Sequence, residues 1–383
     1  GQGCRVGYLG LDGRRQGGCG RKLIADLDLV DILMVFVEFI EAEFMAGVNR
    51  DEQKYGDTHG QTADIDQRIE FVFWKISEGD FKIIFIHVDT PTDGESGKKR
   101  VIKDGYGNIV ADIELVRESR PGKNLNLSID KRIQYLAYRE LKRTVAKHAA
   151  RAGSVVVLSV KTGQILAMVN LPAFNPNDRS NAKYNSIRNR AITDVFEPGS
   201  TVKPFLIAAA LESGEFRPAS KVNTSPGYFN TSGLKVTDYR NYGVVDMQTL
   251  LAKSSNVGAV KVALELDEEA LWQQYRAVGF GQLTGSGFPG EREGKLDSYT
   301  VWNKTQRATM AYGYGMSTTA LQLARAYSVI ANDGVLLPVS FIASNKVGSN
   351  YRIMSSGTAS TVRGMLKAVV SVDGTGSRAM MQS

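Results

Sequence analysis

A serine followed three residues later by a lysine has the clearest chemical potential in this 383-residue chain, because a serine hydroxyl needs a nearby base to become a nucleophile. The pattern begins at Ser96, Ser128, Ser180, Ser200 and Ser232. Ser200 follows a turn, Glu197-Pro198-Gly199, and precedes an apolar helical run, so Ser200 and Lys203 should share one face of a helix. Gly199 lets a substrate approach. We therefore predict Ser200 as the nucleophile and Lys203 as its base.

The surroundings of Lys203 follow from its ordinary pKa. To act as a base at neutral pH, a lysine pKa must fall by about 3 from roughly 10.4, which corresponds to about 4 kcal/mol. A helix dipole contributes only about 0.3 to 1 kcal/mol. We expect burial and a second cation nearby to lower the pKa by most of that amount, so the site should be buried and cationic.

A second polar element, Lys253 to Gly258, lies between two helical patterns and contains the chain's one Ser-x-Asn sequence. The hydroxyl of Ser254 could relay a proton, and the amide of Asn256 could hold a peptide carbonyl and the lysine. A helix N-cap is the alternative interpretation of this element. If the relay is correct, Ser254 Oγ and Lys203 Nζ should lie within about hydrogen-bond reach of Ser200 Oγ.

Other chemistries find little support. A Ser-His-Asp triad would require His148, on a predicted helix, as its base. Cys4 and Cys19 have no histidines at zinc spacing, so we expect no metal, and no cofactor motif is present.

Charge is unevenly distributed along the chain. Residues 1–95 carry 10 basic and 18 acidic side chains, whereas the rest of the chain carries 37 basic and 22 acidic side chains. The positive charges are scattered, which argues against nucleic-acid binding.

The N-terminal quarter differs in composition from the remainder. We predict a helix over Leu23 to Glu43, a hairpin within 71–88, a domain boundary near residue 93, and short strands around the turn at 103–108. The longest apolar stretch, Leu27 to Ile40, is broken by charges and is too short to span a bilayer.

The remaining chain alternates a hairpin with many helices. Ser128 should cap an amphipathic helix that ends near residue 149, with Ile133, Leu136, Leu141 and Val145 among its apolar positions. Strands are predicted from Ser154 to Val160 and from Gln164 to Asn170, joined at a turn where Gly163 is needed. Residues 171–190 should form a loop. Helices are predicted from near Ser200 to Leu211 and over 246–266, 268–278, 305–331 and 357–370.

Several of these segments also carry the motifs of a known family: Gly163 to Met168, Arg190 to Pro204, Lys253 to Gly258, Tyr312 to Gly315 and Leu321 to Tyr327. With them, the chain resembles the penicillin-binding transpeptidases over about residues 94–383. The approach Phe196-Glu197-Pro198-Gly199 is similar to the septal class B type of Gram-negative bacteria, the penicillin-binding protein 3 type.

The resemblance implies an α+β fold, the penicillin-binding serine transpeptidase fold, with an antiparallel sheet flanked by helices and an all-α subdomain. It divides the chain into an N-terminal segment of unknown role at 1–93, a linker or end of a pedestal at 94–127, and a transpeptidase domain at 128–383. Residues 1–93 do not resemble the family's anchor or pedestal.

The resemblance also implies a D,D-transpeptidase that cross-links stem peptides during septal cell-wall synthesis. Ser200, Lys203 and Ser254 would be catalytic, with Asn256 and Gly199 binding substrate. Expected partners are peptidoglycan stem peptides, β-lactam antibiotics and divisome proteins, including the septal glycan polymerase. The expected location is the bacterial inner membrane, through an anchor absent from this chain, with the catalytic domain in the periplasm.

One family motif, Lys-Thr/Ser-Gly-Thr, is not found after the second motif. Lys161-Thr162-Gly163 precedes the nucleophile, and Ser355 to Thr358 lacks the lysine and should open a helix. The motif should begin just after Ser383, so we expect an incomplete C-terminus, an inactive chain and an unpaired sheet edge on the hairpin. A serine β-lactamase, a D,D-carboxypeptidase and a non-catalytic cell-wall scaffold stay open as alternatives.

Overall fold

The computed structural model describes residues 32–37, 98–103, 109–118, 120–122, 124–178, 180, 184–344 and 348–379. The first half contains β1 (Ile32–Val37), β2 (Lys98–Lys103), β3 (Ile109–Arg117), α2 (Lys131–Lys147), β4 (Gly153–Ser159), β5 (Ile165–Leu171), α3 (Tyr184–Ile187) and α4 (Arg190–Thr193). Next come η1 (Gly199–Val202), α5 (Lys203–Glu212), β6 (Lys221–Asn223), β7 (Tyr228–Thr231), β8 (Leu234–Thr237), β9 (Val244–Asp246), α6 (Met247–Ala252) and α7 (Asn256–Glu265). The chain continues through α8 (Glu268–Ala277), η2 (Tyr299–Val301), α9 (Lys304–Met310), α10 (Ala320–Ala331), β10 (Val335–Leu336), β11 (Tyr351–Arg352), α11 (Ser356–Val369) and η3 (Ser377–Ala379).

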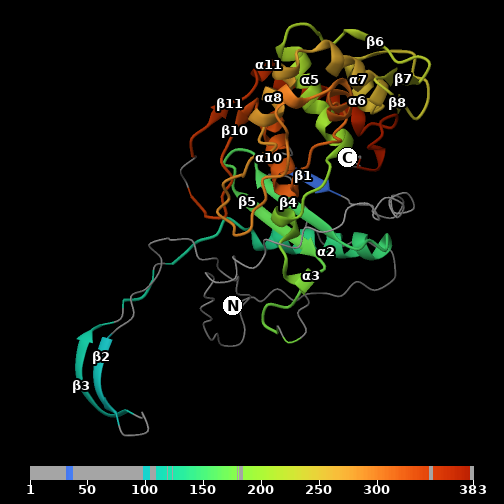
Figure 1. The fold of residues 1–383 in the computed structure, drawn as a ribbon. Helices are drawn as coiled ribbons and strands as arrows, with labels where there is room; N and C mark the ends of the chain where they lie inside the picture. The colour runs from blue at the N-terminus through green and yellow to red at the C-terminus, as the bar shows by residue number, and fades with distance from the viewer. Residues whose placement is uncertain are drawn as a thin grey trace, which may run out of the picture.

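An antiparallel sheet in the order β1-β4-β5 lies at the base of the main body (Figure 1). The predicted hairpin is confirmed: β4 and β5 pair from Gly153 opposite Leu171 to Leu158 opposite Ile165. Gly163 closes its turn with φ +73°, where a Cβ atom would lie 2.2 Å from the carbonyl oxygen of Pro338. Both the backbone conformation and this close approach require glycine.

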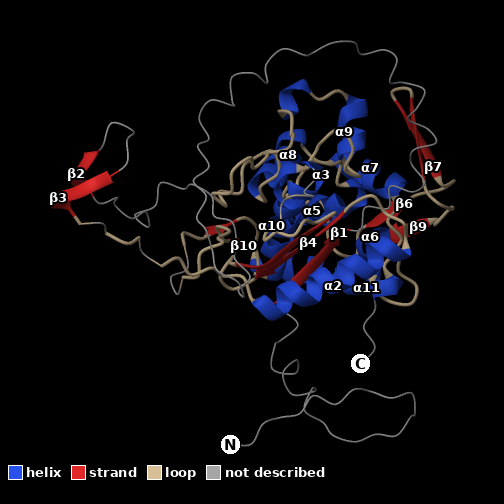
Figure 2. Ribbon diagram, turned by 90° about the horizontal axis from the view of Figure 1, so that it is seen from below, coloured by secondary structure: helices blue, strands red, loops and turns tan. Residues whose placement is uncertain are grey.

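Helices cover both faces of the sheet, as Figure 2 shows for α2 and α10. Because side chains alternate along a strand, Val155 and Val157 of β4 pack against α2, while Val156 and Leu158 face α10. All four are almost fully buried. Because both faces of the sheet are buried, the strands are continuous apolar runs in the sequence. The buried sheet supports the segment that leads to Ser200.

The outer edge of β4 is not free. It pairs with β1, with Ile32 opposite Ser159 and Val37 opposite Ser154. The predicted helix over Leu23 to Glu43 is therefore wrong at residues 32–37, and the predicted unpaired edge on β4 is wrong as well. A short apolar run rich in valine and isoleucine suits either a helix or a strand, and pairing with β4 decides between them. Beside β5, the amide of Ile165 donates to the carbonyl of Ser340 at 2.9 Å.

The start of α2 also differs from the prediction. Asp130 caps the helix by accepting hydrogen bonds from the amides of Arg132 and Ile133. Ser128 is instead buried, and its hydroxyl donates to the carbonyls of Ile165 and Ser340 at 2.8 and 3.0 Å. Sequence reasoning chose the wrong one of two good capping residues, because the alternative partners of Ser128 are distant in the chain. Leu136, predicted among the apolar positions, is 46% exposed.

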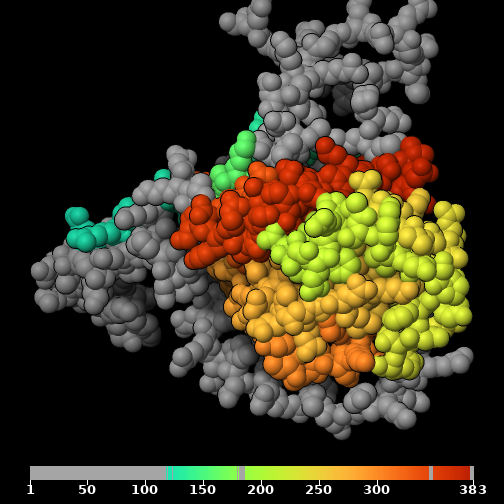
Figure 3. Space-filling view, turned by 90° about the horizontal axis from the view of Figure 1, so that it is seen from above, coloured from blue at the N-terminus to red at the C-terminus, as the bar shows by residue number. Residues whose placement is uncertain are grey.

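The remaining helices form a second body above the sheet, built around α5. Residues 203–210 of α5 are all buried, and its apolar side chains belong to a core shared with α6 to α11. The predicted helices over 246–266 and 305–331 are each interrupted, at 253–255 and 311–319. The other two, over 268–278 and 357–370, are confirmed within about two residues. α11 packs against α5. On the face shown in Figure 3, the red C-terminal part lies beside the yellow-green part of the chain.

The predicted strands around residues 103–108 are confirmed as β2 and β3, a hairpin drawn apart from the main body in Figure 1. The loop predicted over 171–190 includes one short helix, α3. The hairpin predicted within 71–88 lies outside the described residues. In the part of the chain that the structure describes, no helix is both long and apolar enough to span a membrane.

Candidate active site

The predicted nucleophile lies where an extended segment enters a helix. Gly199 begins the 3-10 turn η1, which continues directly into α5 at Lys203. Gly199 has φ +58°, and its amide donates to the carbonyl of Gly313 at 3.2 Å. A Cβ on Gly313 would lie 2.1 Å from the Gly199 carbonyl oxygen, so only glycine allows this approach. Ser200 itself is exposed, which leaves its hydroxyl accessible.

Lys203 lies beneath this turn with 1% of its surface exposed. Its Nζ atom is 2.6 Å from the carbonyl oxygen of Ser254, 3.0 Å from Ser254 Oγ and 2.7 Å from Asn256 Oδ1. Three oxygens therefore match the three protons of an ammonium group. In the neutral amine, two protons still satisfy the carbonyl and the amide oxygen, and the Ser254 hydroxyl can donate to the nitrogen lone pair.

The backbone around Ser254 explains how this arrangement arises. Ser254 connects α6 to α7 with φ +53°, a left-handed conformation that is uncommon for a residue with a side chain. The neighbouring Ser255, not Ser254, is the N-cap of α7, and its hydroxyl accepts from the amide of Gly258 at 2.9 Å. The N-cap interpretation thus applies to Ser255, and the Ser254 hydroxyl is directed to Lys203.

Asp238, at the end of β8, is a site residue that sequence reasoning missed. Its Oδ1 accepts from the amides of Asn256 and Val257 at 2.6 and 3.0 Å, and Ser255 Oγ donates to its Oδ2 at 2.6 Å. A carboxylate is favoured there by the unpaired amides and the dipole of the helix N-terminus. Asp238 lies 18 residues before Asn256, so no local spacing in the sequence relates the two.

The electrostatics of Lys203 differ from the expectation in one respect. Burial lowers its pKa to about 7, as the predicted chemistry requires. Among the residues that the structure describes, the charge that acts on Lys203 is not the expected second cation but the carboxylate of Asp238, which raises the pKa of the lysine. Desolvation therefore lowers the pKa without help from a neighbouring charge, and a large fraction of Lys203 is neutral near pH 7.

The structure brings together Lys203, Ser254 and Asn256, but Ser200 Oγ is not among the hydrogen-bond partners of Lys203 Nζ. The expected contact of the Asn256 amide with the lysine is present, and Lys203 also contacts Ser254 Oγ. The contact of Ser200 with Lys203 is not made in this conformation. Ser200 and Lys203 nevertheless lie three residues apart in one continuous η1–α5 segment.

The loop between α9 and α10 supports the turn from the other side. Glu197 accepts from the amide of Gly315 through Oε1 at 2.9 Å. Phe196 and Thr318 exchange two backbone hydrogen bonds of 3.0 and 2.9 Å. In addition, the hydroxyl of the partly buried Tyr327 on α10 donates to the carbonyl of Thr201 at 2.9 Å. Among the described residues, no cluster of histidine, cysteine and carboxylate side chains could hold a metal ion.

Comparison with known proteins agrees with this arrangement. Residues 153–383 match the family described as penicillin binding protein transpeptidase domain. A Neisseria flavescens protein, "Probable peptidoglycan D,D-transpeptidase PenA", is 44% identical over 285 residues, which cover 74% of this chain and 71% of that protein. "Peptidoglycan D,D-transpeptidase FtsI" of Escherichia coli K12 is 40% identical over 289 residues, covering 76% of this chain and 49% of FtsI. The matched region thus spans about half the length of FtsI, and the same holds for several other relatives.

Solved structures give the same result for the fold. The apo transpeptidase domain of Burkholderia pseudomallei penicillin-binding protein 3 is 41% identical, with a TM-score of 0.62 over 68% of this chain and 75% of that domain. A peptidoglycan glycosyltransferase structure from Burkholderia ambifaria gives a TM-score of 0.62 at 39% identity, over 67% of this chain and 78% of the other. The predicted α+β fold, with its antiparallel sheet and helical body, is confirmed. The chain belongs to the penicillin-binding protein transpeptidase family.

Proposed function

We propose that this protein is a serine-type peptidoglycan D,D-transpeptidase, with Ser200 as the nucleophile, Lys203 as the base and Ser254 as the proton relay. The observation that supports it best is the buried Lys203, whose pKa of about 7 and contacts with Ser254 and Asn256 suit a general base. The family assignment and the names of the PenA and FtsI relatives support the same activity.

In the proposed reaction, Ser200 Oγ attacks the penultimate D-Ala carbonyl of a stem peptide. Its proton passes to neutral Lys203 and, through Ser254 Oγ, to the departing amine of the terminal D-Ala. The acyl-enzyme ester is then attacked by an amine of a neighbouring stem peptide, which releases Ser200. Asn256 Nδ2 donates to the carbonyl of Thr237 at 3.3 Å, which holds the amide beside the lysine. A β-lactam would acylate Ser200 in the same way.

The setting of this activity is also proposed. The relatives named FtsI support a role in septal wall synthesis, at the inner membrane with the catalytic domain in the periplasm. Divisome proteins, including the septal glycan polymerase, would be partners. Residues 1–93 and 94–127 are proposed as an N-terminal segment and a linker that precede the transpeptidase domain at 128–383.

Labelling with a fluorescent penicillin tests the proposal, on a chain extended past Ser383, where the third motif is expected. Mass spectrometry of the labelled intact protein should place one adduct on Ser200, and Ser200→Ala should abolish labelling. Ser232→Ala is a matched control, since Ser232 and Lys235 repeat the same spacing in the β7–β8 turn. An adduct on Ser128 or Ser232 would refute the proposed site. Rapid release of the label as hydrolysed penicillin would favour the β-lactamase alternative, and no labelling at all would favour the scaffold.

A further inference from the structure

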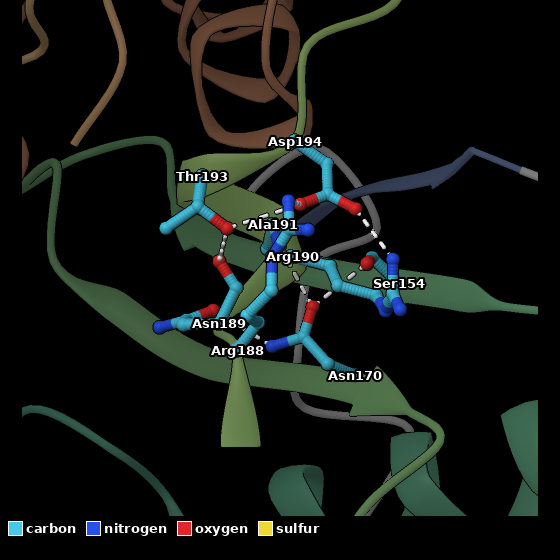
Figure 4. A network of polar contacts seen from close by, with 8 residues as sticks. All are labelled: Ser154, Asn170, Arg188, Asn189, Arg190, Ala191, Thr193 and Asp194. Atoms are coloured by element: carbon cyan, nitrogen blue, oxygen red, sulfur yellow. Dashed lines mark hydrogen bonds and ion pairs between the residues drawn. The ribbon is translucent and has the colours of Figure 1, made fainter. Parts of the chain in front are cut away.

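A network of polar side chains joins the sheet to the segment before Ser200 (Figure 4). At its centre, the carboxylate of Asp194 receives two guanidinium groups. Arg188 Nη2 donates to Oδ1, and Arg190 Nη1 donates to Oδ2 at 2.6 Å. The hydroxyl of Thr193 lies 3.1 Å from both Asp194 Oδ1 and the carbonyl oxygen of Asn189, which share its one proton. Each carboxylate oxygen therefore has its own charged donor, an arrangement stronger than an ordinary surface ion pair.

The other end of the network lies on the sheet. Asn170 of β5 accepts from Ser154 Oγ of β4 at 2.7 Å and from the amide of Ala191 at 2.8 Å, both through Oδ1. Its Nδ2 donates to Asn189 Oδ1 at 2.7 Å. Ala191, on α4, is fully buried between the sheet and α10. One side-chain amide thus attaches the beginning of α4 to both strands of the hairpin.

The helix that this network holds cannot be stable by itself. α4 has four residues, Arg190–Thr193, whereas isolated helices shorter than about 12 residues are marginal in water. Asp194 is its C-cap, and a carboxylate at a helix C-terminus is unfavourable unless cations neutralise it. Arg188 and Arg190 supply those cations. The position of α4 therefore depends on the contacts of Asp194 and Asn170 as well as on the burial of Ala191 and Ile192.

Asp194 has an extended backbone, and six residues lead from it to Ser200, with Pro198 in a helical conformation and Gly199 in a left-handed one. This strap, defined here as residues 194–199, is held to the α9–α10 loop at Phe196 and at Gly199. Its start is fixed to the sheet through α4. A displacement of Asp194 would be transmitted along the strap to the nucleophile, because the strap is only six residues long and its hydrogen bonds at Phe196 and Gly199 limit how far it can rearrange.

We propose that Asp194 is a positioning residue for the acylation reaction: clamped by Arg188 and Arg190, it fixes the strap that carries Ser200 to the sheet. The inference rests on the proposed function. It predicts an effect on the acylation rate constant and not on the initial binding of the β-lactam, because the Asp194 carboxylate is engaged by Arg188, Arg190 and Thr193 and acts only through the backbone.

The test compares Asp194→Asn with wild type in the intact protein, using stopped-flow acylation by a chromogenic β-lactam. The acylation rate constant should fall about tenfold at an unchanged dissociation constant of the initial complex, since a misplacement of about 1 Å can cost up to 10²-fold. Asp194→Glu, which keeps the charge, should recover part of the rate. Asp333→Asn is the matched control, because it also removes a carboxylate paired with an arginine, Arg363, at 2.9 Å.

Each outcome decides the matter. An acylation rate constant within twofold of wild type in folded Asp194→Asn overturns the inference, and so does an equal fall in the control. If Asp194→Asn does not fold, Arg188→Gln replaces it, because Asp194 then keeps its pair with Arg190. That variant should lose several-fold in rate with a melting temperature close to wild type, and an unchanged rate overturns the inference. A wild-type protein that is never acylated refutes the proposed function itself.

Discussion

The acylation rate should depend on pH through the buried Lys203. At its ordinary pKa of 10.5, about 0.03% of this lysine would be neutral at pH 7, whereas at a pKa of about 7 roughly half is neutral. Burial thus raises the fraction of active base at pH 7 by roughly 10³-fold. The second-order acylation rate constant should rise about tenfold per pH unit up to about pH 6 and level off above about pH 8.

Replacing Asp238 by asparagine should shift the pH dependence of the acylation rate to lower pH. The negative charge of Asp238 raises the pKa of Lys203, so its removal should lower that pKa and shift the rising part of the profile to lower pH. The amides at the start of α7 can still donate to the asparagine oxygen. Asp246→Asn is the matched control, since Asp246 caps α6 by accepting from the amide of Thr249 at 2.9 Å.

The assay is fluorescent-penicillin acylation from pH 5 to pH 9, with melting temperatures recorded at each pH to confirm that the variants are folded. A profile without an inflection between pH 6 and 8 would refute Lys203 as the titrating base. A shift of Asp238→Asn to higher pH, or an equal shift in Asp246→Asn, would refute the assigned role of the Asp238 charge. Lys203→Arg, which stays charged throughout this range, should not be acylated. Lys261→Arg, on the exposed side of α7, should behave as wild type.

Three further predictions concern the same site. Because the pKa of Lys203 is lower in the folded protein than in the unfolded chain, the unfolded chain binds more protons between pH 7 and 10.5. Denaturant titrations should therefore show the free energy of unfolding of wild type rising relative to Lys203→Met, by about 3 kcal/mol from pH 7 to pH 10. Gly313→Ala should lower both the melting temperature and the acylation rate, since its Cβ would lie 2.1 Å from the Gly199 carbonyl oxygen; unchanged acylation would contradict the geometry of the turn. Ser254→Gly should relieve the left-handed strain and match or exceed wild type in stability, by up to about 1 kcal/mol, while acylation falls; wild-type acylation would exclude Ser254 as the relay.

Much of the site was predictable because its signals are local. Ser200 and Lys203 are related by one helical turn, and an apolar run after a Pro-Gly turn indicates the helix that places them. The β4–β5 hairpin was equally predictable from two β-rich runs around Gly163. These features depend on residues within about twenty positions of one another, where backbone geometry leaves few alternatives.

Other features depend on residues far apart in the chain. The spacing of Lys253 to Gly258 was compatible with a cap or a relay, and the structure divides these roles between Ser255 and Ser254. Sequence reasoning proposed a second cation for Lys203, yet the neighbouring charge is Asp238, which β8 brings to the start of α7. Desolvation cannot be read from composition, since it depends on how completely the surrounding helices exclude water from one side chain.

The sequence by itself determined the hairpin, most of the helices and the candidate nucleophile with its lysine, because each is encoded by periodicity and turn chemistry within a short segment. Only the tertiary structure decided that β1 covers the edge of β4, that Ser128 is a buried donor and not a cap, and that Asp238 accepts from the amides at the start of α7. In each of these cases the deciding partner is a backbone edge, a carbonyl or a charge whose position depends on how the elements pack. Hydrogen bonds and ion pairs act over a few ångströms in space, and distance along the chain does not determine which groups come that close.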